Sequence, residues 1–428
     1  IYPLSLHDAL PISATLQSCV GVQQGDPLGP LLFAAAVHRL ALDLKAGPLD
    51  LSMFYLDDGL LAGDIGPVAN ALHHIQQRAA ELGLHLNLQK SEVVAVGAIP
   101  DGAFPGPLPA ALCATPDGAS RVVRDFEFLG APVGSDAFLD GHTSRRVESA
   151  TALLDALGAL ADPQVALRLL RSSAGFCRMA YSMRCSPPTA QQTAFAGFDS
   201  LVHRCFSSFT GLHLTDEQWQ QATRGLRHAG LGLRSVHSHA PAAFLASLGG
   251  CAHKCQELDP NYPTDLGTSP EACGAVAAFN AQLPQAAHVT LSAALGKRQA
   301  DLSHLLDAAG WEAQLASSSA MAKAGLLSEA EPGGRAFLTA LPAGRTRMEP
   351  AHFVSEVRAR LGVPDASHDA WCPRCDAVLD RHSVHASMCV AGGERNQRHN
   401  SLRDLVHGWA EKAGLQPERE RAGLLLPQ

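Results

Sequence analysis

The chain has 428 residues, of which 46% are hydrophobic and 17% charged, with a formal net charge of −8. This composition excludes a wholly disordered chain, and the length allows two or three domains. The negative charge argues against a protein whose whole surface binds nucleic acid, although it leaves room for a local basic groove.

The 11 cysteines are scattered and follow no signal peptide, which favours reduced thiols over a disulfide framework. No apolar run reaches the length that spans a membrane. The first residues, IYPLSLHDALPIS, have no helical or strand period. Residues 4–12 look like one reading frame of a sequencing-library adapter. We therefore interpret residues 1–13 as an adapter-derived scar, and expect that the natural protein continues upstream of residue 14.

The next stretch contains a Gly/Pro-rich loop, a helix and a hairpin. The loop covers residues 21–30, and Pro27 or Pro30 opens the helix. Apolar residues then flank Asp57 and Asp58 in MFYLDDGLLAG, which predicts two strands with the aspartates at the tip. Two adjacent carboxylates on a rigid hairpin suit divalent cations, whereas an isolated DDG is more often a solvated turn.

Residues 69–82 are expected to form a helix that Gly83 ends. Short strands are predicted at residues 85–88 and 92–96, on either side of Lys90. A loop rich in Pro, Gly and Ala covers residues 97–120, and β structure resumes at FEFLG, residues 126–130.

From residue 143 to about 248 the pattern is helical. Residues 140–235 hold ten arginines and seven acidic residues, an excess of +3 in an acidic chain. Such a segment could bind a nucleic-acid backbone, and ordinary solvated helix faces explain it equally well. A linker is predicted at residues 257–274, followed by Ala-rich helices to residue 327 and a second Pro/Gly stretch to residue 350.

Near the C-terminus, Cys372 and Cys375 form a C-x₂-C pair, and His385 and Cys389 are spaced by one helical turn. Three cysteines and a histidine at these spacings match a closed, structural Zn²⁺ site. His382 and His399 are alternative ligands, and unligated thiols are the competing interpretation. The following residues, 401–413, are expected to be helical.

Four stretches, in this order, resemble the reverse transcriptase of LINE-type (non-LTR) retrotransposons. They are GVQQGDPLGPLLF (21–33), YLDD (55–58), GLHLNLQKS (83–91) and FLG (128–130). Each is weak alone, but four in the right order at short intervals are specific. The resemblance covers residues 19–135 closely and a helical thumb, to about residue 250, more loosely.

The resemblance implies a role for each matching residue. Asp57 would hold both catalytic Mg²⁺ (or Mn²⁺) ions with Asp58 as an auxiliary ligand, and Lys90 would protonate the leaving pyrophosphate or steady its charge. The remaining residues would contact nucleotide, primer or template: Gln24, Gly25 and Pro27 under the nascent base pair, Tyr55 at the primer terminus, and Leu129 and Gly130 in the primer-grip hairpin. The alternatives are a core position for Tyr55 and an exposed strand lysine without a catalytic role for Lys90.

The sequence departs from the family pattern at Gln23, Asp26 and Gly29, where the commoner residues are Pro, Ser and Ser. Asp26 places an extra carboxylate near the expected triphosphate path. The family also uses a further metal-binding aspartate on an upstream strand, and residues 14–20 contain no acidic side chain. We therefore expect that this chain does not polymerise by itself.

The predicted fold class is α+β: a partial right-hand polymerase palm, a mostly helical thumb and connection, and a small zinc-binding module. The predicted domains are an adapter scar (1–13), palm (14–135), thumb (136–250), linker and connection (251–350), and zinc knuckle with the start of a further region (351–428). Implied partners are an RNA template, a DNA primer or target and deoxynucleoside triphosphates, in the nucleus and without a membrane. The oligomeric state is left open. The alternatives are a non-catalytic nucleic-acid-binding remnant of a decayed retroelement and a maturase-like splicing cofactor.

Overall fold

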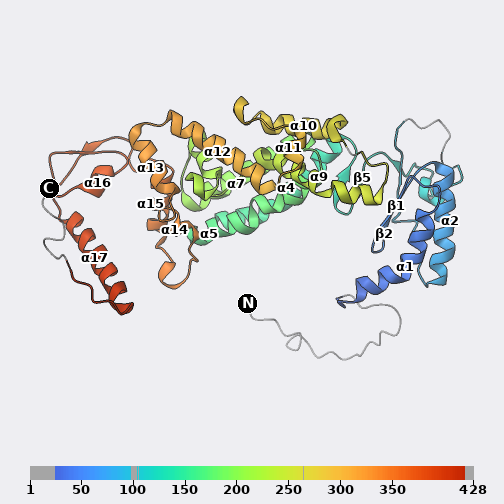
Figure 1. Ribbon diagram of the computed structural model, residues 1–428, viewed down its shortest axis with the longest axis horizontal. Helices are drawn as coiled ribbons and strands as arrows, with labels where there is room; N and C mark the ends of the chain where they lie inside the picture. The colour runs from blue at the N-terminus through green and yellow to red at the C-terminus, as the bar shows by residue number, and fades with distance from the viewer. Residues whose placement is uncertain (1–24, 98–103, 105, 264, 420–428) are drawn as a thin grey trace. The chain divides into compact units, whose positions relative to one another are not determined.

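The computed structural model describes residues 25–97, 104, 106–263 and 265–419 (Figure 1). The chain divides into two compact units: unit 1 comprises Ile1–Leu139 with Cys251–Asp265, and unit 2 comprises Asp140–Gly250 with Leu266–Gln428. Helices dominate, and the strands form small sheets, so the α+β prediction is confirmed at this level. The assignment of a palm and a thumb stays a prediction.

Unit 1 holds the first three helices and the first six strands of the described chain. The helices are α1 (Gly29–Lys45), α2 (Ile65–Glu81) and α3 (Ala110–Cys113). The strands are β1 (Leu51–Tyr55), β2 (Asp58–Ala62), β3 (Val93–Val94), β4 (Val122–Val123), β5 (Phe126–Phe128) and β6 (Ala131–Val133).

The predicted hairpin exists as β1 and β2, which pair antiparallel from Leu51 with Ala62 to Tyr55 with Asp58. Phe54 lies opposite Gly59, and a Cβ on that glycine would come 2.8 Å from the phenyl ring. Gly59 therefore makes room for a core ring, in addition to marking the end of the turn.

Unit 1 has two small hydrophobic clusters, and α2 contributes residues to both. Leu40 and Leu44 of α1 meet Ala71 of α2, and Phe54 and Leu61 of the hairpin pack against them. The second cluster is built around α3 and also contains residues of α2, β3 and β4: Leu108, Leu112, Cys113, Ile65, Val68, Ala69, Leu72, Leu88, Val93, Phe104 and Val122. The hairpin is thus supported by two helices through one face.

The segment after α2 differs from its prediction. Gly83 has φ of +73° and follows the end of α2, as expected, but residues 85–88 form no strand. Here the side chain of Asn87 accepts hydrogen bonds from the amides of Gln89 and Lys90, at 3.1 and 3.2 Å. This local turn replaces strand pairing. The strand predicted at 92–96 is shorter, at Val93–Val94, and pairs in parallel with β4.

Every sheet in the described residues has two strands: β1-β2, β3-β4, β5-β6 and β7-β8. The larger shared sheet that a palm assignment implies is therefore not formed within the described part of unit 1.

Unit 2 is mostly helical, as predicted, and two of its helices extend past its sequence bounds. Its longer helices are α4 (Asp136–Gly158), α7 (Gln192–Thr210), α9 (Val236–Leu258), α10 (Pro270–Asn280), α12 (Gln299–Ser317), α13 (Ala320–Ala330), α15 (Pro350–Arg360) and α17 (Glu394–Lys412). Its shorter α-helices are α5 (Pro163–Leu169), α6 (Ala180–Cys185), α8 (Asp216–Thr223), α11 (Leu291–Leu295), α14 (Ala336–Thr339) and α16 (Val384–Met388).

Shorter turns connect these helices. They are the π-helix η2 (Leu170–Ala174) and the 3₁₀ turns η3 (Phe176–Met179), η4 (Pro188–Gln191), η5 (Leu226–His228), η6 (Leu266–Thr268), η7 (Gln285–Ala287) and η8 (Gly344–Thr346). The linker predicted at 257–274 is therefore shorter than expected, because α9 reaches Leu258 and α10 begins at Pro270.

The main core of unit 2 is built from phenylalanine, leucine and methionine side chains. Phe195, Phe198 and Phe206 of α7 are almost completely buried. Phe353 and Val357 of α15, which lie about 150 residues further along, belong to the same cluster. A second cluster around Phe279 joins α9, α10, α11 and α12.

Beyond α15 the chain forms a small module with few apolar contacts of its own. Strand β7 (Ala370–Trp371) pairs antiparallel with β8 (Val378–Leu379), and α16 follows. In the parts of the chain that the structure describes, no helix combines the length and apolar character needed to cross a membrane.

Candidate functional site

The two aspartates lie at the tip of the β1–β2 hairpin. Tyr55 and Asp58 form the last strand pair, so that Leu56 and Asp57 make a two-residue loop. Leu56 has φ of +55°, in the left-handed region that tight hairpin loops use. Asp57 and Asp58 are both exposed. Tyr55 is 60% exposed, which rules out the core position considered for it. Carboxylates so placed can accept a hard cation from solvent.

The loop before α1 is described only in part. Gln24 lies outside the described residues; Gly25 has φ of +94°, and Gly25 and Pro27 are exposed. The carboxylate of Asp26 accepts a hydrogen bond from the amide of Leu28 at 2.9 Å. This hydrogen bond closes an Asx turn just before α1, a kind of turn that Ser can also form.

Lys90 is exposed and lies in the turn made by Asn87, not on a strand. The half-buried side chain of Arg121, thirty residues further along the chain, makes hydrogen bonds to this turn. Its guanidinium donates to the carbonyl oxygens of Leu88 (3.4 Å), Gln89 (2.9 Å) and Ser91 (3.2 Å), and also to that of Ala111. The conformation around Lys90 therefore depends on one distant arginine.

Arg121→Ala should loosen this turn. With four carbonyl groups losing a charged donor, amide hydrogen exchange at residues 88–91 should speed up by at least about 10-fold, since each charged hydrogen bond contributes about 1.5–3 kcal/mol. Arg124→Ala is the matched control, because among the described residues Arg124 donates to a single carbonyl, that of Gly97, at 3.0 Å. Unchanged protection of residues 88–91 in Arg121→Ala would contradict the assignment.

The FLG stretch forms the turn of the β5–β6 hairpin. Phe128 pairs with Ala131, and the loop residues Leu129 and Gly130 have φ of +50° and +78°. Two positive φ angles in succession are typical of a type I′ turn. At the open end of this hairpin, Asp125 accepts hydrogen bonds from the amide and hydroxyl of Ser135, at 2.6 and 3.1 Å. The predicted primer-grip residues thus form the turn of a hairpin, in which Leu129 is exposed and Gly130 half-buried.

A comparison with known families gives a match to the part of the chain that contains these three turns. Residues 11–133 match the family model described as "Reverse transcriptase (RNA-dependent DNA polymerase)". This stretch is similar to reverse transcriptase domains. A search of curated proteins gave no significant match. The match includes the aspartate hairpin, the Lys90 turn and the β5–β6 hairpin, and it supports the reverse transcriptase assignment of this stretch. The LINE-type affiliation stays a prediction.

In the described part of the stretch that matches the family model, Asp57 and Asp58 are the predicted Mg²⁺ ligands. No group of three converging His, Cys, Asp or Glu side chains there includes Asp57 or Asp58. No hydrogen bond or ion pair links Asp57 to Lys90 in that part of the chain either. The roles of these residues therefore remain predictions.

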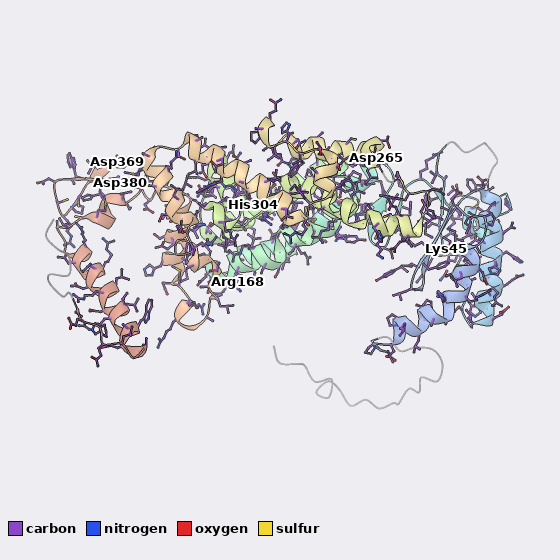
Figure 2. All side chains as sticks on the ribbon, viewed as in Figure 1. Lys45, Arg168, Asp265, His304, Asp369 and Asp380 are labelled. Atoms are coloured by element: carbon purple, nitrogen blue, oxygen red, sulfur yellow. The ribbon has the colours of Figure 1, made fainter. Side chains whose placement is uncertain are left out.

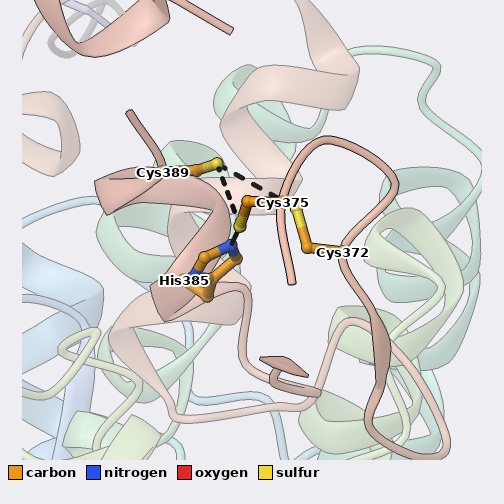
Figure 3. A group of neighbouring side chains, drawn as sticks. All are labelled: Cys372, Cys375, His385 and Cys389. Atoms are coloured by element: carbon orange, nitrogen blue, oxygen red, sulfur yellow. Dashed lines mark hydrogen bonds between the residues drawn. The ribbon is translucent and has the colours of Figure 1, made fainter. Parts of the chain in front are cut away.

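The C-terminal module brings the four predicted zinc ligands together (Figure 3). One candidate donor atom from each of Cys372, Cys375, His385 and Cys389 lies within 4.8 Å of the others. Sγ of Cys375 is 3.3 Å from Nε2 of His385, and Sγ of Cys389 is 4.0 and 3.9 Å from the other two sulfurs. Neither alternative histidine, 382 or 399, belongs to this group.

The donor chemistry of this group suits Zn²⁺, because three thiolates and one imidazole are a common tetrahedral set. The amide of Arg374 donates to Sγ of Cys372 at 3.5 Å. This hydrogen bond, together with those to His385 and Cys375, lowers the pKa of the Cys372 thiol to about 6. A lowered pKa favours the thiolate form, which is the form that binds a metal ion.

Sequence reasoning missed the residue that builds the second half of this group. Asp380, marked in Figure 2, accepts hydrogen bonds from three backbone amides around the start of α16. Nearby Asp369 accepts one, from the amide of Arg381 at 2.8 Å. The available signal was an aspartate four residues before the first helical residue, which resembles an ordinary turn residue.

The arginine-rich segment turns out to be used largely inside unit 2. Arg168, marked in Figure 2, and Arg171 donate to carbonyl oxygens at the end of α14. The other internal partners are Gly310 and Gln314 for Arg224, Asp307 for Arg234, Asp155 for Arg204, Gln299 for Arg184 and the ring of Tyr181 for Arg146. Arg145, Arg178 and Arg227 have no such partner in the described part of the chain. The basic-groove interpretation is correspondingly weaker.

Proposed function

We propose that this chain derives from the reverse transcriptase of a LINE-type retrotransposon, an enzyme that carries out RNA-templated DNA synthesis, here in the nucleus. The observation that carries the proposal is the family match over residues 11–133 together with two exposed aspartates at its hairpin tip. Its substrates would be an RNA template, a DNA primer or target and deoxynucleoside triphosphates.

In this proposal each turn of the reverse transcriptase domain has a task. Mg²⁺ or Mn²⁺, when bound, would lower the pKa of the primer 3′-hydroxyl and neutralise charge on the phosphates. Asp57 would hold both ions and Asp58 would assist, while Lys90 would donate a proton to the leaving pyrophosphate. The Gln24–Pro27 loop would lie under the nascent base pair. Tyr55 and the Leu129–Gly130 turn would position the primer terminus.

The C-terminal module would hold structural Zn²⁺ through Cys372, Cys375, His385 and Cys389 and would contact template or target. Trp371, next to the first ligand, is 76% exposed, and Arg374 between the cysteines is also exposed. An exposed indole can stack on an unpaired base, while arginine contacts phosphate, as in other single-strand binders.

Metal-directed cleavage tests the role of the aspartates without requiring turnover. Fe²⁺ with ascorbate and oxygen, in place of Mg²⁺, cleaves the backbone beside a bound ion. With template–primer and deoxynucleotide present, we expect cuts close to residues 57 and 58, which excess Mg²⁺ suppresses and Asp57→Asn abolishes. The matched control is Asp50→Asn, because Asp50 is exposed at the open end of the same hairpin. Cuts that persist in Asp57→Asn would overturn the assignment.

The second candidate is a non-catalytic nucleic-acid-binding remnant of a decayed element. It is favoured by the absence of a third converging carboxylate beside the aspartates in the described residues. Two protein carboxylates leave a pair of ions short of ligands, so we expect little primer extension from this chain alone. Robust Mg²⁺-dependent primer extension would contradict that expectation and would also reject the hypothesis of a non-catalytic remnant.

A further inference from the structure

We propose that Asp380 is a positioning residue that pre-forms the His385–Cys389 half of the zinc site. The proposal rests on the proposed function of that site. Asp380 contacts none of the four ligand side chains through its own hydrogen bonds. It acts on the backbone that carries two of them.

The carboxylate of Asp380 uses both oxygens. One accepts hydrogen bonds from the amides of His382, at 3.0 Å, and Val384, at 3.1 Å. The other accepts the amide of His385, a predicted ligand, at 2.7 Å. The carbonyl of Asp380 also accepts the amide of Ser383 at 2.9 Å, and Ser383 has φ of +56°. One residue therefore fixes the chain through the turn and into the helix.

The helix needs this support because it is short. Helix α16 has five residues, Val384–Met388, and a single helical turn is unfavourable by itself in water. Its first amides have no intrahelical acceptor, and Asp380 supplies one for two of them. At the other end the amide of Cys389 donates to the carbonyl of His385 at 2.8 Å. Only when this turn is formed do His385 and Cys389 project from the same side.

Electrostatics alone predicts that Asp380 weakens zinc binding, the opposite of what a positioning role predicts. A Zn²⁺ ion with three thiolates and a neutral imidazole has a net charge of −1, so a nearby carboxylate should weaken the site electrostatically. Removing Asp380 should then leave zinc affinity unchanged or raise it. If Asp380 acts by positioning, its removal must lower the affinity. The sign of the change therefore separates the two mechanisms.

The experiment is a Zn²⁺ titration of the full, reduced chain in competition with a chromophoric chelator. Asp380→Ala should bind Zn²⁺ about 10- to 100-fold more weakly than the unmodified chain, the usual effect of losing a residue that orients a metal ligand. Asp380→Asn, which keeps one acceptor oxygen, should fall between the two. The matched control is Asp376→Asn, because Asp376 is exposed and lies beside Cys375. It should change the affinity less than twofold, or tighten binding.

Co²⁺ provides a second readout that a changed ligand set would move. At saturation, the visible d–d bands of Asp380→Ala should match those of the unmodified chain, because the same three thiolates and imidazole bind the ion. His385→Ala should change the band positions. An affinity of Asp380→Ala within twofold of the unmodified chain, or equal losses in Asp380→Ala and Asp376→Asn, would overturn the role of Asp380 alone. Failure of the unmodified chain to bind Zn²⁺ would overturn the zinc site and this role together.

Discussion

Replacing Arg360 by methionine is expected to lower the free energy of unfolding of unit 2 by about 3–5 kcal/mol. The side chain of Arg360 is fully buried at the end of α15. It donates to the carboxylate and carbonyl of Glu329, both at 2.8 Å, and to three further carbonyls, those of Gly230, Gly334 and Leu226, at 3.0–3.1 Å. Methionine keeps the length of the stem but leaves these acceptors buried without a donor.

Urea unfolding followed by tryptophan fluorescence measures this effect, because all four tryptophans of the chain lie in unit 2. Arg358→Met is the matched control on the same helix. Arg358 is partly exposed, pairs with Asp365 at 3.6 Å and donates to one carbonyl, that of Pro364, at 2.8 Å, so its loss should cost less than that of Arg360, about 1 kcal/mol. Equal stabilities of the two variants would show that the buried contacts of Arg360 contribute little net free energy.

Lowering the pH from 7 to 5 is expected to remove about 2 kcal/mol of stability from unit 2 through His239 alone. His239 is 5% exposed and packs edge-on against Phe176, with ring centroids 5.8 Å apart. Burial, assisted by the positive charge of Arg234, lowers its pKa to about 3. In the unfolded chain the pKa is near 6.5, so the unfolded state binds the proton first. The loss therefore begins as the pH falls through about 6.5 and continues to about 3.

His239→Phe removes this titration and should reduce the difference in unfolding free energy between pH 7 and pH 5 by about 2 kcal/mol. His213→Phe, at an exposed position, should leave that difference as it is in the unmodified chain. Urea unfolding at both pH values is the measurement. If His239→Phe keeps the full pH dependence, other groups must account for the acid sensitivity.

The elements that sequence reasoning identified correctly are those that local rules determine. Apolar runs on both sides of Asp57 and Asp58 predict a hairpin, and the resemblance predicts a second one at Leu129–Gly130; both hairpins exist. The four predicted zinc-binding side chains converge, because two pairs at short spacing need only one loop and one helical turn to come together; zinc binding itself stays a prediction. Residues 85–88 were predicted wrongly, because the side chain of Asn87 forms a local turn in place of a strand ladder.

The contacts that sequence reasoning missed join residues far apart in the chain. Arg121 reaches back about thirty residues to the Lys90 turn, and Arg360 reaches Leu226 across 134 positions. Strand β3 pairs with β4 across the Pro/Gly-rich loop. No spacing rule relates such partners, and an arginine that binds carbonyls inside the protein has the same composition signature as one that binds phosphate.

Most arginines of residues 140–235 already have partners within unit 2, and this affects how nucleic-acid binding by this segment should depend on ionic strength. Each phosphate that a protein neutralises releases counterions and adds about −0.9 to the slope of log affinity against log salt concentration. Ten arginines on the surface would give a slope of about −9. With Arg145, Arg178 and Arg227 as the uncommitted ones among the described residues, this segment would contribute a slope of only about −3. The affinity of this segment for a nucleic acid should therefore fall much less with rising salt concentration than its number of arginines suggests.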